Sequence, residues 1–322
     1  MQARGSVYLV LGMGVFAVGW AAIFIRLADA PALSTAAFRL TFASAPVAGY
    51  AALRHRGDLR GLRRGEWWLL AGSGAALAVH FASWIASLQL TTVASSVALV
   101  TTQPLWAALI AAVALGERVT RGTLLAILVA TAGGALIGLR DFAAGGEALW
   151  GDALALVGAL CAAIYFTIGR RVRAELDLPA YIGVVYPVAA VLLLGTAAIG
   201  RQPLSGFPAQ TWAMFLLLAL VPQLVGHSSL NWAVRYLPAH VVTVALLGEP
   251  VISTVLAVPF LGESPGALRV VGGAVTLVGV YLAIREEMRR ARAGGADGEV
   301  ASMPDVVAPI NVELALAEEE TR

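Results

Sequence analysis

Apolar residues fill this chain in long blocks, and a short polar segment separates each block from the next. A helix crosses a bilayer core of about 30 Å with roughly 20 apolar residues. Blocks of that length recur until residue 284, and the residues after them are mixed and charged. The pattern predicts an all-α membrane protein with ten transmembrane helices, over residues 6–28, 34–53, 67–89, 92–115, 121–139, 150–170, 179–199, 210–232, 239–261 and 266–284. Residues 285–322 are expected to form a disordered cytoplasmic tail.

The second half of the chain repeats the first. A shift of 146 residues aligns matching residues of the two copies: Pro104 with Pro250, Leu115-Gly116-Glu117 with Leu261-Gly262-Glu263, Gly133 with Gly279 and Leu136 with Leu282. Each copy closes a block of five predicted helices, and after an odd number of crossings the second block enters the membrane inverted. We therefore expect a first five-helix repeat over residues 1–139 and an inverted second repeat over 140–284, with a solute site where they meet at mid-depth.

Arginine positions predict the orientation. The chain has no lysine, so all 22 basic residues are arginine. With a cytoplasmic N-terminus, sixteen of them fall on the inner side, and the outer side holds four: Arg26, Arg140, Arg201 and Arg269. Basic residues are retained on the cytoplasmic side, so both termini are expected there.

Composition narrows the possible functions. The chain is 59% hydrophobic and 13% charged, with a mean hydropathy of +0.80, which lies outside the range of soluble proteins. Its single cysteine, Cys161, excludes an intrachain disulfide. No phosphate-binding loop motif, HExxH motif or Cys/His cluster occurs in the sequence. We expect no cofactor, no metal and no nucleic-acid partner.

Two charged residues fall inside predicted spans, where charge is costly and usually functional. Arg39 lies early in the second span, and Glu249 lies near the middle of the ninth, directly before Pro250. The repeat mate of this pair is Gln103-Pro104. Proline interrupts a helix, and matching interruptions in two halves indicate a transporter's binding site. Glu249 is either a proton-sensitive or substrate-facing group, or a fixed partner of Arg39.

Histidines and aromatic residues at mid-depth supply further candidates. Each half carries a histidine followed by a tryptophan about one turn later, and polar or aromatic residues lie near them: Trp20, His80, Trp84, Trp106, Tyr165, His227 and Asn231. Such rings either line an apolar cavity or pack between helices with a satisfied N–H or O–H group. Small residues at Gly134, Gly138 and Gly272-Gly273 form packing seams, which suit either a scaffold or a homodimer surface.

Together these motifs resemble the EamA family of the drug/metabolite transporter superfamily over about residues 6–284. The family-like residues are most typical in the second half: Asn231-Trp232-Ala233, Pro238-Ala239, Glu249-Pro250-Val251 and Leu261-Gly262-Glu263. The resemblance implies ten helices with cytoplasmic termini in the bacterial inner membrane, and export of amino acids or other small metabolites. No acidic residue lies mid-membrane in the first helix, unlike in the small four-helix drug exporters, so a cation-binding multidrug mechanism is not expected.

The sequence thus predicts a secondary transporter, not an enzyme, with alternating access around a mid-membrane pocket. We expect the pocket to bind a neutral or zwitterionic solute through Trp20, His80, Trp84, Gln103, Trp106, Tyr165, His227, Asn231 and Glu249. Protons are one candidate coupling ion. Two alternatives stay open at this point: proton-independent exchange, and a membrane-embedded hydrolase that pairs His80 or His227 with Ser228 or Ser229.

Overall fold

In its described part, the computed structural model is all-helical, which confirms the all-α part of the predicted fold class. It describes residues 2–90, 96, 99–100, 102–114, 119–138, 146–262 and 267–294, and these ranges contain no strand. The helices are α1 (Gln2–Val18), α2 (Ala21–Ala28), α3 (Ala32–Arg54), α4 (Arg56–Gly61), α5 (Arg64–Leu90), α7 (Gln103–Ala114), α8 (Arg121–Gly138), α9 (Glu147–Val172), α10 (Leu178–Ile199), α11 (Ala209–Leu218), the π-helix η1 (Ala219–His227), α12 (Ser228–Ala233), α13 (Ala239–Ala245), α14 (Gly248–Leu261) and α15 (Ala267–Gly294).

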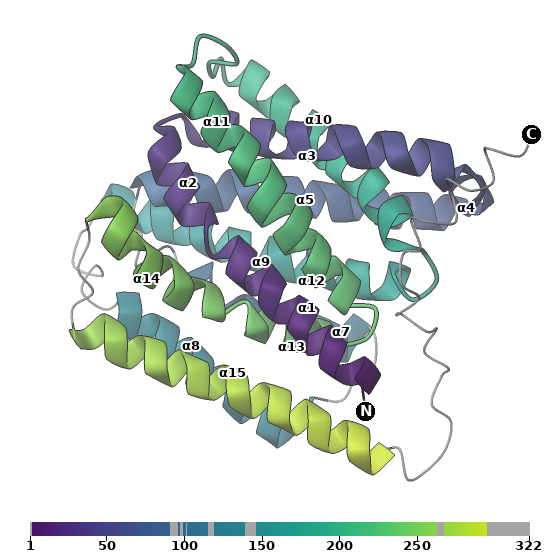
Figure 1. Ribbon diagram of the computed structural model, residues 1–322, viewed down its shortest axis with the longest axis vertical. Helices are drawn as coiled ribbons and strands as arrows, with labels where there is room; N and C mark the ends of the chain where they lie inside the picture. Colours follow the sequence, from purple (N-terminus) through teal and green to yellow (C-terminus); the bar gives the residue numbers. More distant parts are fainter. Residues whose placement is uncertain are drawn as a thin grey trace, which may run out of the picture.

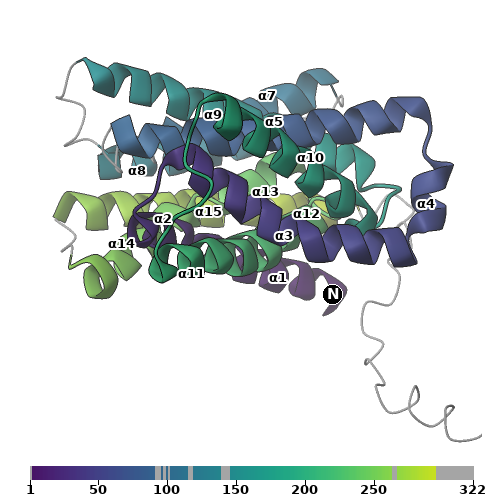
Figure 2. The same ribbon diagram turned by 90° about the horizontal axis from the view of Figure 1, so that it is seen from above.

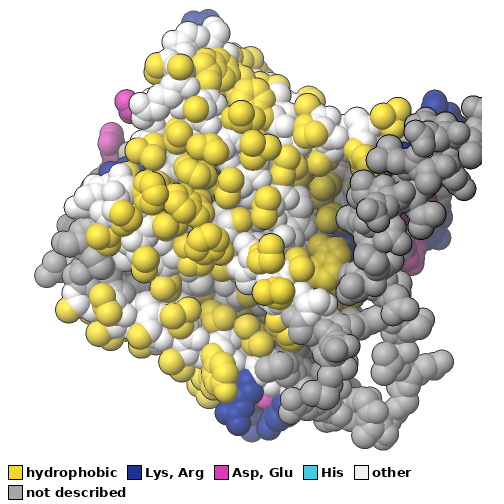
Figure 3. Space-filling model, viewed as in Figure 1, with side chains coloured by type: hydrophobic (Ala, Val, Ile, Leu, Met, Phe, Trp, Pro, Cys, Tyr) yellow, Lys and Arg dark blue, Asp and Glu magenta, His cyan; other side chains and the backbone are white. Residues whose placement is uncertain are grey.

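Several of these helices are long and apolar enough to cross a membrane. Six segments meet that description: Ser6–Ala28, Arg64–Leu90, Leu149–Val172, Leu178–Ile199, Ala209–Ala233 and Val241–Leu261. Most of the long helices run along one common direction (Figures 1 and 2). One face of the molecule is almost wholly hydrophobic, with charged side chains at its margins (Figure 3). These features describe a multi-pass membrane protein, and the count of ten crossings stays a prediction.

Helices from the two halves pair with one another. α3 packs on α10, α5 on α9, α1 on η1 and α12, α7 on α13, and α8 on α15. The α8–α15 pair lies at one edge of the bundle, and α3, α10 and α11 lie at the opposite edge (Figure 1). Exchanging the first five predicted spans with the second five leaves this set of pairs unchanged.

Small residues bring α8 and α15 into close contact. A Cβ atom added at Gly133 would overlap Thr276, and one added at Gly279 would overlap Ala130. The Thr276 hydroxyl donates to the Ala130 carbonyl at 3.4 Å. Gly133 and Gly279 are repeat mates, and so are Ala130 and Thr276, because each pair is 146 residues apart. Gly133 and Gly279 therefore pack α8 against α15 within one chain.

Three of the helical segments are interrupted at mid-length. α1 ends at Val18 and α2 begins at Ala21, and α13 ends at Ala245 before α14 begins at Gly248. Between α11 and α12, the π-helix η1 contains Pro222, whose nitrogen cannot donate a backbone hydrogen bond. The polar residues His227 and Glu249 lie in two of these segments.

The N-terminus, α4 and the end of α15 lie at the same end of the bundle (Figures 1 and 2). α15 continues to Gly294, beyond the residue where the tail was expected to begin. Gly262 ends α14 in the left-handed conformation, with φ of 69°, as a C-terminal cap does. The repeated segment at Leu115-Gly116-Glu117, together with Glu263 and residues 295–322, lies outside the described residues.

Candidate functional site

A pocket lies in the middle of the helix bundle, which we call the central pocket. Helices from both halves of the chain line it, and it holds about 440 Å³ of space free of protein atoms, counting the space at its mouth. The cavity proper has a volume of only about 30 Å³, well below the roughly 300–1,000 Å³ of pockets that hold small molecules, so the pocket is nearly closed in this conformation and must widen to admit a solute. Its lining residues are Val18, Arg39, His80, Trp84, Val100, Gln103, Ala162, Tyr165, Phe166, His227, Leu246 and Glu249.

One helix supplies both His80 and Trp84. The two residues are four apart on α5, so they lie on one face, and their rings stack with centroids 6.0 Å apart. The Nδ1 atom of His80 lies 2.9 Å from the carbonyl oxygen of Gly158 on α9. This contact requires a hydrogen on Nδ1, because a carbonyl only accepts. It leaves Nε2 as the free nitrogen of the neutral ring.

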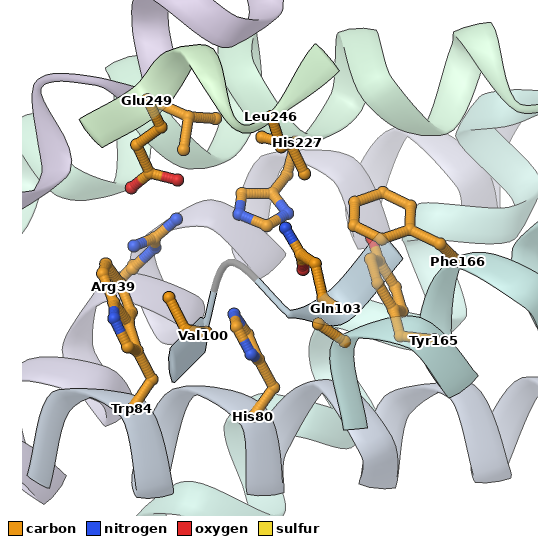
Figure 4. A pocket seen from close by; sticks show the side chains of 12 residues that line it. Arg39, His80, Trp84, Val100, Gln103, Tyr165, Phe166, His227, Leu246 and Glu249 are labelled. Carbon is orange, nitrogen blue, oxygen red and sulfur yellow. The ribbon is translucent and has the colours of Figure 1, made fainter. Parts of the chain in front are cut away.

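The π-helix η1 carries two buried polar residues, Gln223 and His227. Short π-helical segments occur mainly at functional sites, because the extra residue per turn rotates side chains out of the α-helical register. The His227 ring stacks on Phe166 at 6.2 Å and meets Phe81 edge-on at 5.3 Å. In Figure 4, the Gln103 amide and the His227 ring point toward one another.

Arg39 is fully buried on α3 and has an unusual set of partners. Its Nε atom donates to Oε1 of Gln223 at 2.9 Å, and its guanidinium carbon lies 4.1 Å from the centroid of the Phe81 ring. Its terminal nitrogens, Nη1 and Nη2, make no hydrogen bond with any residue in the described part of the chain. Gln223 and Phe81 therefore hold the guanidinium group in place, and its two terminal nitrogens are buried without a hydrogen-bond partner among the described residues.

Glu249 faces Arg39 across the central pocket (Figure 4). It lies in the first turn of α14, where the helix dipole favours a negative charge. Its backbone N–H donates to the carbonyl of Leu246 at 2.8 Å, across the break between α13 and α14. No ion pair joins Glu249 to Arg39 in the described structure, so a gap separates the two charged groups.

A hydrogen-bond network lies behind the pocket wall. The Asn231 amide donates to the hydroxyl of Tyr165 and, at 3.4 Å, to that of Tyr186. The hydroxyl of Tyr186 lies 3.3 Å from Oγ of Ser228. Asn231 is itself completely buried. Its role here is to hold Tyr165 in the wall, because it does not reach the pocket.

The structure brings together seven of the residues that the sequence singles out, and three lie elsewhere. Arg39, His80, Trp84, Gln103, Tyr165, His227 and Glu249 line the central pocket. Asn231 lies behind it, as described above. Trp20 packs against Phe24 and Phe260, with ring centroids 5.5 and 5.0 Å away. Trp106 is partly buried on α7 and does not line the pocket.

The two prolines that the sequence singles out, Pro104 and Pro250, lie at the starts of helices. Pro104 is the second residue of α7, and Pro250 lies in the first turn of α14. Both therefore begin helices instead of bending them in the middle. This position costs little, because the first N–H groups of a helix have no intrahelical partner.

Sequence reasoning missed Gln223, Phe81 and Phe166. Gln223 was detectable as a polar residue inside an apolar span, next to a proline. The two phenylalanines carry no such signal, because an apolar residue in an apolar helix has no visible special role.

A second buried arginine lies at the end of the bundle near α4. Arg173, just after α9, donates from Nε to the carbonyl of Asn231 at 3.2 Å and from Nη1 to the carbonyl of Leu176. Burial lowers the pKa of Arg173 to about 10, so the group stays charged at neutral pH. Nearby, Arg170 donates to the carbonyls of Val234 and Arg235. We call this set the α9–α12 latch, because it ties the end of α9 to the end of α12.

Three potential metal ligands also meet at this end. Atoms of His55, Asp58 and Asp177 lie within 4.8 Å of one another. His55 already contacts Asp58 at 2.9 Å, and Asp177 pairs with Arg235 at 2.9 Å. Both carboxylates are exposed, and these existing partners account for the group without a metal.

Comparison with known proteins shows which family this chain matches. The model of the EamA-like transporter family matches two segments, residues 3–139 and 149–285. A protein of Streptantibioticus cattleyicolor, named as a probable terminal-alkyne amino-acid exporter, is 30% identical over 210 residues, which cover 62% of this chain and 67% of that protein. An uncharacterized transporter of Archaeoglobus fulgidus is 28% identical over 269 residues, or 84% of this chain and 93% of its own.

A solved crystal structure shares the fold. It superimposes with a TM-score of 0.72 at 21% sequence identity, and the match covers 89% of this chain and 99% of the other. At that identity the likeness concerns the fold alone. The matched family and the named relatives are transporters and not enzymes.

Proposed function

This chain belongs to the EamA-like transporter family, and from that premise we propose that it is a secondary-active exporter of small neutral or zwitterionic metabolites such as amino acids. The observation that carries the proposal is the central pocket. It combines charged, polar and aromatic side chains from both halves of the chain in the middle of an apolar bundle. A few convergent polar groups in a largely apolar cavity are typical of small-molecule sites.

The nature of the wall supports this substrate class. Arg39 and Glu249 supply one charge of each sign, and His80, Gln103 and His227 supply orienting hydrogen bonds. A multiply charged phosphate compound needs several cations, whereas Arg39 is the only arginine among the described residues that line the pocket. The name of the Streptantibioticus cattleyicolor relative, an amino-acid exporter, is compatible with the same choice.

The proposed topology is ten crossings in two inverted repeats, over residues 1–139 and 140–284. The exchange-symmetric pairing of helices supports it, and so does the reciprocal contact of Gly133 with Thr276 and of Gly279 with Ala130. The arginine distribution supports cytoplasmic termini in a bacterial inner membrane. The shared location of the N-terminus and the end of α15 agrees with an even number of crossings (Figure 1).

Alternating access requires segments that bend around the pocket. The breaks in α1–α2 and α13–α14 and the π-helix η1 all border the central pocket, since Val18, His227, Leu246 and Glu249 come from these segments. Irregular helices at membrane depth are found where they line a cavity, because the cavity or its ligand satisfies the freed backbone groups. We propose that these segments move when the pocket opens to either side, and that protons drive export through Glu249.

Transport in vesicles tests the proposal. The full chain is reconstituted into liposomes, and efflux of a panel of radiolabelled amino acids and uncharged metabolites is followed with and without a pH gradient. We expect saturable efflux of one class of solute that a pH gradient accelerates. Saturable exchange without any effect of the gradient would replace proton coupling by facilitated exchange, and no efflux beyond empty liposomes would refute the function.

A further inference from the structure

The outer edge of the Arg39 guanidinium group carries hydrogen-bond donors that no described residue of the chain pairs with. Its guanidinium group carries a full positive charge in the middle of the bundle, and two of its three nitrogens have no hydrogen-bond partner among the described residues. An unpaired buried charge is strongly unfavourable. Such an arrangement persists where a ligand supplies the missing acceptors.

The geometry of that edge specifies the missing ligand. The Nε atom is committed to Gln223, and Phe81 covers one face of the guanidinium group, at 4.1 Å. This leaves Nη1 and Nη2 as the free donors, and they belong to the Arg39 side chain that lines the central pocket. Two parallel N–H donors match the two oxygens of a carboxylate, and such bidentate pairs are stronger and more specific than single hydrogen bonds.

The charge opposite Arg39 completes the recognition site. Glu249 faces the guanidinium group without pairing with it directly (Figure 4). With Glu249 ionised, the two side chains have no net charge, and a neutral zwitterion preserves that balance. A solute with only an amine or only a carboxylate leaves one unbalanced charge at membrane depth, which is costly.

Resting on the proposed transport function, we propose that Arg39 binds the carboxylate of the transported solute and Glu249 binds its ammonium group. Gln223 is a positioning residue, because it holds the guanidinium group but does not line the pocket. Val18, Trp84, Phe166 and Leu246 form an apolar part of the wall that fits an apolar or aromatic side chain.

Matched triplets of compounds test this assignment. The purified full chain is titrated in a thermal-shift assay with each of the twenty L-amino acids, its carboxamide and its decarboxylated amine. At least one amino acid is expected to bind, with its carboxamide and amine weaker by about tenfold or more, because they cannot form the charged bidentate pair. A carboxamide that binds within about twofold of its parent acid overturns the proposal.

Variants separate recognition from folding. Arg39→Lys keeps the charge but loses the two parallel N–H donors of the guanidinium group. The ratio of affinities for the acid and its carboxamide is therefore expected to fall toward one. Gln223→Leu is expected to reduce the same ratio, which a merely structural role would leave unchanged. Arg173→Lys is the control, since it alters an equally buried arginine outside the pocket. An unchanged ratio in Arg39→Lys refutes the role of Arg39.

Transport assays in liposomes distinguish a failure of the carboxylate site at Arg39 from a failure of the proposed transport function. If liposomes export a solute without a carboxylate and no amino acid binds, the carboxylate site is wrong and the transporter stands. If liposomes export none of the solutes, the proposed function itself fails.

Discussion

Two regions of this protein bury an arginine completely and treat it in opposite ways. In the α9–α12 latch, backbone carbonyls of Asn231 and Leu176 accept from Arg173, so its charge is satisfied within the protein. In the central pocket, Arg39 keeps two nitrogens without a partner among the described residues. A paired buried charge stabilises a packing arrangement, whereas an unpaired one beside a cavity is available to a ligand. Burial alone therefore does not distinguish a structural arginine from a functional one.

The largest effect is expected from removing the charge in the pocket. Arg39→Gln eliminates the free donors, and the loss of one partner of a buried charged pair costs about 2–5 kcal/mol. Transport in liposomes is expected to fall by roughly a hundredfold or more, since each 1.4 kcal/mol is about tenfold. The melting temperature is expected to stay close to that of the unmodified protein or to rise, because an uncompensated charge is gone. A large drop in stability with near-normal transport per folded molecule would mean that Arg39 has a structural role and does not bind the solute.

The second-largest effect is expected from removing the carboxylate of Glu249, on the other side of the pocket. Glu249→Gln removes the only acidic side chain that lines it within the described part of the chain, and we expect transport to fall by about tenfold, or 1.4 kcal/mol. If protons couple through this residue, the remaining transport loses its dependence on pH. Arg39, His80 and His227 also line the pocket, so a pH profile that persists in Glu249→Gln assigns the titrating group to a histidine. Initial rates between pH 5.5 and 8.5 distinguish these outcomes.

The matching change in the latch is expected to affect stability. Arg173→Gln leaves two buried carbonyls without their donor, and an unsatisfied buried group costs about 1–3 kcal/mol. We expect a lower melting temperature in detergent and a preserved ratio of affinities for an amino acid and its carboxamide. A changed ratio with unchanged stability would mean that the latch takes part in recognition.

Asn231 connects the two regions and tests whether they are independent. Its side chain supports Tyr165 in the pocket wall, and its backbone carbonyl accepts from Arg173. Asn231→Ala keeps the backbone contact and removes the amide, so we expect a few-fold loss of transport with a loss of stability of about 1 kcal/mol. Because Arg173 donates to the backbone of Asn231, the double variant with Arg173→Gln is expected to deviate from additivity in stability by about 0.5–3 kcal/mol. Additive losses of stability would mean that the two regions are independent.

The smallest effect is expected outside both regions. Trp106 is partly buried but does not line the pocket. Trp106→Phe is expected to change transport by less than about twofold, because substitutions away from special features rarely exceed about 0.5 kcal/mol. The same change at Trp84, which stacks on His80, serves as the matched comparison and is expected to be larger. Equal effects at the two positions would argue against the observed pocket boundary.

The predicted site residues that are chemically unusual for their surroundings are the ones that lie together. Arg39, His80, Gln103, His227 and Glu249 are polar residues in apolar spans, and all five line the central pocket. Trp20 lies elsewhere, against Phe24 and Phe260, because an aromatic residue in a membrane helix packs as well against other rings as against a solute. Asn231 lies behind the wall, where its amide supports Tyr165.

By itself, the sequence determined that the chain is all-helical, that it is a multi-pass membrane protein and that it belongs to a transporter family. Hydropathy and local spacing express these properties directly, because the bilayer permits few backbone structures. The tertiary structure decided which buried polar groups satisfy one another and which do not. Gln223 takes one nitrogen of Arg39 from 184 residues away, and no local pattern encodes that distance. Whether a buried charge is satisfied depends on such contacts, and they exist only once the helices are packed.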